Sequence, residues 1–141
     1  MLLNTFKDIR AKLSPISEIK AVQWFNAQYD GIIHIQPVIF VEFPEKLQFE
    51  KLTKTERKTP ITIRLHLVSS AIADAGNNIA DEIIEKHESI GHDIVNALEN
   101  IPVAFLDGQT RYLEFSAWQH YQKYKGWMIT FIEFTTRAII T

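Results

Sequence analysis

The feature that most constrains the fold is a pair of long strand-like runs near the C-terminus. The runs cover Arg111–Tyr121 and Gly126–Ile140, with only Gln122–Lys125 between them, and a turn is predicted just ahead of them at Asp107-Gly108. Two such runs with a short connection predict a β-hairpin. Their large apolar side chains are Tyr112, Phe115, Trp118, Tyr121, Trp127, Phe131 and Phe134. These occupy both faces, whereas a sheet with one solvated face alternates apolar and polar residues. Both faces therefore need a cover, supplied by the chain's own helices or by a second copy.

Length and composition limit the classes of protein that this chain can belong to. Its 141 residues suit one domain, and no linker, repeat or low-complexity tract divides it. The absence of cysteine removes disulfides and thiolate chemistry and fits folding inside a cell. A net charge of −2 argues against generalised nucleic-acid binding, which usually requires a basic domain. No run reaches the ~20 apolar residues of a membrane span. We therefore expect a single soluble domain, 1–141, with no membrane association.

Periodicity along the chain predicts an α+β fold. Apolar residues at helical spacing predict amphipathic helices over 2–13 and 79–98. Alternation predicts a strand over Pro60–Ser69, a continuous apolar run predicts one over Gln36–Phe43, and β-branched and aromatic residues favour a third over Glu18–Tyr29. With the terminal hairpin, this order predicts two main helices packed on a mostly antiparallel sheet of four to five strands.

A charged segment, 45–59, separates the predicted strands Gln36–Phe43 and Pro60–Ser69 and is long for a loop in a compact domain. It fits an ordinary solvated loop, a flexible arm that orders against a partner, or a basic contact for nucleic acid. Phe49 and Leu52 favour a protein partner, because exposed apolar side chains gain by docking. The candidate interface residues are Phe49, Lys51, Leu52, Lys54, Arg57 and Lys58 from this segment, and Trp118 and Trp127 from the hairpin.

His87 and His92 are the first candidates for a metal site. A zinc-protease helix places its two histidines four positions apart, whereas these are five apart and diverge by about 140° around a helix. We therefore expect both on the solvated side of the helix, without a shared zinc. Acidic residues between Asp74 and Glu88 are expected to complement the helix dipole rather than to bind a cation. Serine, histidine and aspartate show no triad spacing, so the residues predict neither a catalytic site nor a cofactor.

The order of these segments resembles the small tail-terminator and tail-completion proteins of long-tailed bacteriophages and prophages. The resemblance covers nearly the whole chain and consists of pattern and order rather than a signature motif. The matching segments are the amphipathic N-terminal helix, the apolar strand Gln36–Phe43, the charged loop, the strand Ile61–Leu67, the helix ending Gly91–Leu98 and the closing strand Trp127–Phe134.

This resemblance implies a non-enzymatic assembly protein with an α+β fold and no cofactor. Proteins of this group form a ring, typically of six subunits, that caps the tail tube and joins the head-completion proteins. The implied partners are further copies of the chain, the tail-tube protein and the head-completion or connector protein, with DNA passing through the lumen without sequence-specific binding. The implied location is the virion tail, and the host cytoplasm during assembly. The alternatives are another neck or head–tail connector component, or a small metal-dependent hydrolase built on His87 and His92.

Overall fold

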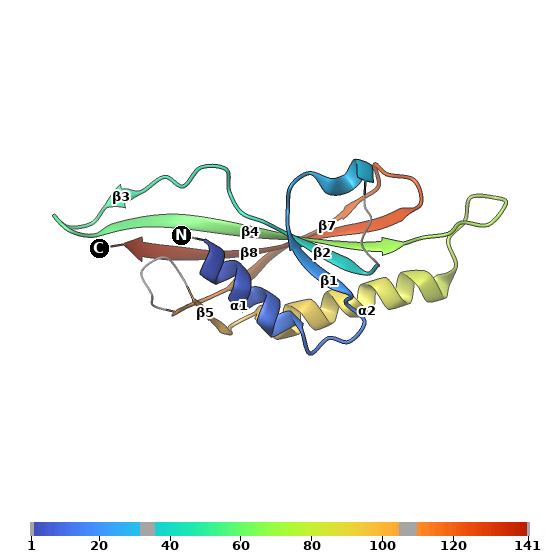
Figure 1. The fold of residues 1–141 in the computed structure, drawn as a ribbon, viewed down its shortest axis with the longest axis horizontal. Helices are drawn as coiled ribbons and strands as arrows, with labels where there is room; N and C mark the ends of the chain where they lie inside the picture. Colours follow the sequence, from blue (N-terminus) through green and yellow to red (C-terminus); the bar gives the residue numbers. More distant parts are fainter. Residues whose placement is uncertain (1, 32–35, 105–109, 141) are drawn as a thin grey trace.

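The computed structural model describes residues 2–31, 36–104 and 110–140, and its main elements follow the predicted order (Figure 1). The turn predicted at Asp107-Gly108 lies outside these residues. The elements are α1 (Leu3–Leu13), β1 (Ala21–Trp24), the 3-10 helix η1 (Gln28–Gly31), β2 (Val38–Glu42), β3 (Glu50–Lys51), β4 (Arg57–Ser70), α2 (Asp81–Leu98), β5 (Pro102–Ala104), β6 (Thr110–Tyr112), β7 (Glu114–Tyr121) and β8 (Trp127–Ile140).

The main sheet has six strands, slightly more than the four to five predicted, and the α+β class is confirmed. Its order is β1-β2-β4-β8-β7, and β3 pairs with the beginning of β4. Only β1 and β2 are parallel; the other pairs in this sheet are antiparallel. Strands β4 and β8, of 14 residues each, pair along their whole length from Arg57↔Ile140 to Ser70↔Trp127. These two strands form the long axis of the molecule (Figure 1).

Both helices lie on one side of the sheet, and η1 lies on the other (Figure 1). Residues spaced by three or four positions bury one face of each helix, as an amphipathic helix requires. In α1 these are Thr5, Phe6, Ile9 and Leu13, and in α2 they are His87, Ile90, Gly91, Ile94 and Leu98. Alternate residues of β4, from Ile61 to Leu67, join them in the larger core cluster.

The opposite face of the sheet carries a second, smaller apolar cluster. Its buried members are Val38, Phe40, Val68, Ile129 and Phe131. The aromatic side chains packed against them come from the segment around η1 and from the β7–β8 turn, and are Phe25, Tyr29, Tyr121, Tyr124 and Trp127. The chain therefore covers apolar residues on both faces itself, with helices on one face and aromatic side chains on the other.

Several element boundaries differ from the sequence expectation. The strand expected over Glu18–Tyr29 shortens to β1, because Ala27 adopts a left-handed φ of 54° and the chain turns into η1. The first run of the hairpin divides at Leu113: β6 pairs with β5 in a separate two-stranded sheet, and only β7 pairs with β8. The second helix begins at Asp81 rather than Ile79.

The segment predicted as a charged loop is partly strand. Glu50 pairs with Lys58 and Lys51 with Arg57, so β3 and the beginning of β4 form a small hairpin. Thr53 Oγ1 closes its turn by accepting a hydrogen bond from the Glu56 N–H at 3.0 Å. We call residues 45–58 the arm. No helix of the described chain is long and apolar enough to cross a membrane.

Candidate functional site

The eight predicted interface residues fall into three separate places. Six of them, Phe49, Lys51, Leu52, Lys54, Arg57 and Lys58, belong to the arm at one end of the β4–β8 pair. Trp127 begins β8 at the other end, beside the last residue of β4, and Trp118 lies on β7. Figure 1 shows the arm at one extremity and the beginning of α2 at the other. The fold therefore brings together the arm residues but not the two tryptophans.

The arm presents both apolar and basic side chains to the exterior. Leu52 is 43% exposed, and Phe49 is partly buried. Lys51, Lys54 and Arg57 are exposed, whereas Lys58 lies 3.6 Å from the Glu50 carboxylate. An ion pair this exposed contributes little stability. Leu47 packs against the larger core cluster and fixes the base of the arm, so the outer part of the arm extends from an anchored base.

Trp118 packs within the chain, between β7 and α2. Its indole lies directly against Gly91 of α2 and stacks on the His92 ring, with ring centroids 5.5 Å apart. It is partly buried and contacts the larger core cluster. These contacts give Trp118 a role in seating α2 on the sheet, and its role in an interface remains a prediction.

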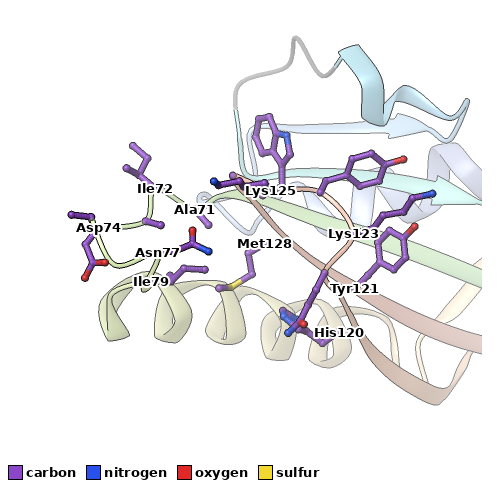
Figure 2. Close-up of a pocket in the computed structure, with 16 residues that line it drawn as sticks. Ala71, Ile72, Asp74, Asn77, Ile79, His120, Tyr121, Lys123, Lys125 and Met128 are labelled. Atoms are coloured by element: carbon purple, nitrogen blue, oxygen red, sulfur yellow. The ribbon is translucent and has the colours of Figure 1, made fainter.

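An open groove of about 860 Å³ lies at the end of the sheet opposite the arm. One wall is the β4–α2 connection, residues 71–79, and the other is the β7–β8 turn with its flanks, residues 120–128. Figure 2 shows the groove between Ile72 and Asn77 on one side and Lys123 on the other, with α2 beneath it. Ile72 is 81% exposed, and Trp127, which also lines the groove, is partly buried.

The first wall is shaped by hydrogen bonds at Asp74. Its Oδ1 accepts from the backbone N–H of Gly76 at 2.8 Å and of Asn78 at 2.9 Å. The sequence analysis gave this connection no functional role and did not predict the groove. The available signal was Ile72, an isolated large apolar residue in that linker, together with the aromatic residues that flank the β7–β8 turn.

A polar network links η1 to the second face of the sheet. His66 Nε2 lies 2.7 Å from a Glu42 carboxylate oxygen, and its Nδ1 is hydrogen-bonded to the Tyr29 hydroxyl. Because a carboxylate only accepts, Nε2 carries the proton of the neutral ring and Nδ1 accepts from Tyr29. Burial lowers the pKa of His66 below its ordinary value, and the hydrogen bond to Glu42 opposes that shift. Arg64 extends the network, because its Nη1 lies 3.8 Å from Glu42 Oε1 and its Nη2 lies 2.8 Å from Glu133 Oε1.

The sequence carboxylate, imidazole, hydroxyl in this network has the order of a catalytic triad. However, burial and the Glu42 charge raise the pKa of Tyr29, which is the opposite of what an activated nucleophile needs. Phe25 stacks on the His66 ring at 4.3 Å between centroids, and Tyr29 contacts Phe40 edge-on. The network therefore fastens the aromatic cover to the sheet.

The expectation that both helix histidines face solvent is wrong for His87. It is 1% exposed, and its Nδ1 and Nε2 lie 2.7 Å from Ser69 Oγ and 2.8 Å from Thr130 Oγ1. Those hydroxyl groups project from β4 and β8 toward α2 and satisfy the buried ring. Burial, with a smaller contribution from His120, lowers the pKa of His87 to about 4. His92 is exposed, as expected.

This geometry does not assemble the metal-dependent hydrolase considered as an alternative. Both ring nitrogens of His87 are engaged by hydroxyl groups, and His92 stacks on Trp118 instead. Within residues 2–31, 36–104 and 110–140, no three histidine, aspartate or glutamate side chains are grouped so as to hold a metal ion. The arm, with the exposed Leu52, and the groove, with the exposed Ile72, are the candidate functional sites.

Comparison with known proteins places the fold. No protein-family model matches the sequence, and no curated protein matches it. Among solved structures, the chain is similar to one described as "Virion of native gene transfer agent (GTA) particle". The likeness is one of fold. It covers 97% of this chain and 92% of that chain with a TM-score of 0.64, at 11% sequence identity. The whole architecture, rather than one motif, is thus shared with a virion component.

Proposed function

We propose that this chain is a non-enzymatic structural protein of a phage-like particle, and that it acts as a tail terminator. The observation that carries the proposal is the likeness to a gene transfer agent virion chain, which extends over 97% of this chain. The order of elements, which resembles tail-terminator proteins, supports the finer assignment. The proposal places the protein in the virion tail, and in the host cytoplasm during assembly.

A terminator ring requires two different surfaces on each subunit, because a closed ring is built from head-to-tail contacts. The arm and the groove meet this requirement, since they differ in shape and lie at opposite ends of β4 and β8. In the proposed ring, typically of six subunits, one rim contacts the tail-tube protein and the other contacts the head-completion or connector protein. DNA passes through the lumen without sequence-specific binding. A chain with a net charge of −2 would not hold the DNA tightly.

The first experiment is light scattering of the purified protein over a wide concentration range, with negative-stain images of the most concentrated sample. The proposal predicts closed rings with a mass near six times the 16.3 kDa of the chain. Binding to purified tail tubes then separates a terminator from another neck or connector component, which would bind the portal side instead. The terminator function would be refuted if the protein stayed monomeric at every concentration and did not bind tail tubes.

A further inference from the structure

We propose that the arm of one copy docks in the groove of the next copy, with Leu52 seated near Ile72 and the arm's basic residues facing the acidic beginning of α2. This inference rests on the proposed ring and names the contact that would close it. It commits to a second copy of this chain as the occupant of the groove. The two surfaces come from opposite ends of the same molecule, as Figure 1 shows for the arm and the beginning of α2.

The separation of the two surfaces rules out a contact within one chain. The arm ends in the first two residues of β4, Arg57 and Lys58, which pair with β3. The groove begins at Ala71, just past the other end of β4. A strand rises about 3.3 Å per residue, so 14 residues span about 45 Å. The arm of one copy can therefore reach only the groove of another, and such a contact is head-to-tail.

Both surfaces leave apolar groups uncovered that a second copy would bury. Leu52 is 43% exposed on the arm, and Ile72 is 81% exposed on the wall of the groove. Tyr124 and Trp127 add partly buried aromatic surface to the same groove. Its volume of about 860 Å³ accommodates several side chains. Contact between these apolar groups would remove them from water and favour association.

Charge complementarity points to the arm as the occupant. Lys51, Lys54 and Arg57 are exposed, and none of them forms an ion pair with the described residues. Asp81 and Glu82 lie in the first turn of α2, which begins two residues after Ile79 of the groove wall, and both are exposed. The exposed cations of the arm and the exposed carboxylates of the first turn of α2 therefore lie at opposite ends of the molecule, which favours a head-to-tail encounter between copies.

The groove also accommodates the acidic residues of the arm. Lys123 and Lys125 lie on its second wall, across from Asp74 (Figure 2). Glu50 and Glu56 lie among the basic residues of the arm. A DNA backbone would leave these carboxylates and the exposed Leu52 without favourable contacts, whereas a groove with walls of both charges matches them.

Cysteine cross-linking tests this contact cleanly, because the chain has no cysteine of its own. Leu52→Cys and Ile72→Cys are made as separate proteins, mixed at ~10 µM and treated with a short bis-maleimide. Both positions are exposed, so both variants should fold. Neighbouring sites in a contact have an effective concentration in the millimolar range. The mixed dimer should therefore form about a hundred-fold faster than by random collision.

The matched control replaces Ile72→Cys by Tyr112→Cys, a 64% exposed position on β6 outside the groove. Equal rates for the two mixtures would overturn the inference, as would faster coupling of Leu52→Cys to itself. Light scattering of the unmodified protein separates the two proposals. Rings without the expected cross-link would reject this contact and leave the terminator ring intact. Monomers without the cross-link would reject the contact and remove the support for self-assembly in solution. Cross-linked dimers without rings would support the contact and count against closure.

Discussion

The contact between Gly91 and Trp118 can be tested with Gly91→Ala, which should destabilise the protein when Trp118 is present and stabilise it when Trp118 is replaced. A Cβ added at Gly91 would overlap Cη2 of the Trp118 indole and would lie 3.0 Å from Cζ3 and 3.2 Å from Cζ2. The indole also stacks on His92, which limits its room to move away. Gly91→Ala thus forces a rearrangement of the contact that seats α2 on β7.

Helix propensity and overpacking act in opposite directions on the free energy of unfolding of Gly91→Ala. Replacing glycine by alanine inside a helix gains about 1 kcal/mol of helix propensity. Overpacking a filled site costs roughly 1–3 kcal/mol. We therefore expect Gly91→Ala to lower the free energy of unfolding by about 1 kcal/mol. In a Trp118→Leu background the overlap is absent, and the same change should raise the free energy of unfolding by up to about 1 kcal/mol.

Urea unfolding followed by circular dichroism measures both effects in a four-protein cycle of wild type, the two single variants and the double variant. Ser89→Ala, at an exposed position of the same helix, is the control for propensity alone and should be mildly stabilising. If Gly91→Ala has the same effect in both backgrounds, or stabilises the wild type, the proposed steric conflict with Trp118 is wrong.

Three further outcomes are expected. Because burial holds the pKa of His87 at about 4, below its unfolded value near 6.5, stability should fall as pH drops from about 6.5 to 4. His87→Gln should flatten that part of the unfolding-versus-pH curve, and an unchanged slope would contradict the assignment. Replacing Lys51, Lys54, Arg57 and Lys58 by serine should leave the melting temperature within about 2 °C but abolish oligomers in light scattering; a large loss of stability would mean that the arm supports the core. Trp127→Ala should cost about 2 kcal/mol, less than the ~3–5 kcal/mol of a fully buried tryptophan, because its ring is only partly buried. It should also slow cross-linking between the Leu52→Cys and Ile72→Cys variants, and normal cross-linking would remove Trp127 from the contact.

The elements that sequence reasoning predicted well are those with strong local patterns. The alternation after Pro60 marks β4, and the spacing from Ile90 to Leu98 marks α2, because burial of one face fixes such periods. Strand β3 escaped prediction because its two residues are ordered by pairing with β4 rather than by their own preferences. The same dependence on a distant partner explains the break at Leu113, where the chain leaves one sheet for the other.

The sites were harder to predict because they join residues far apart in the sequence. His87 can be buried because Ser69 and Thr130 offer hydroxyl groups from two strands. The sequence of the helix itself does not predict these hydrogen-bond partners. The groove likewise forms where the β4–α2 connection meets the β7–β8 turn. The arm was recognised from its charge and length, although its hairpin was not.

The position of β8 in the sheet has a consequence for how the chain folds. Strand β8 lies between β4 and β7, so β7 joins the sheet only through β8, and β4 lacks its partner on that side until β8 has paired. Ser70 pairs with Trp127 and Arg57 with Ile140, so the partners are between 57 and 83 residues apart. Contacts this distant in sequence slow folding, because the intervening chain must be ordered before they form. During synthesis, which proceeds N-terminus first at about 5–20 residues per second, β4 would wait several seconds for its central partner. Its unpaired edge is exposed to other nascent chains throughout that interval.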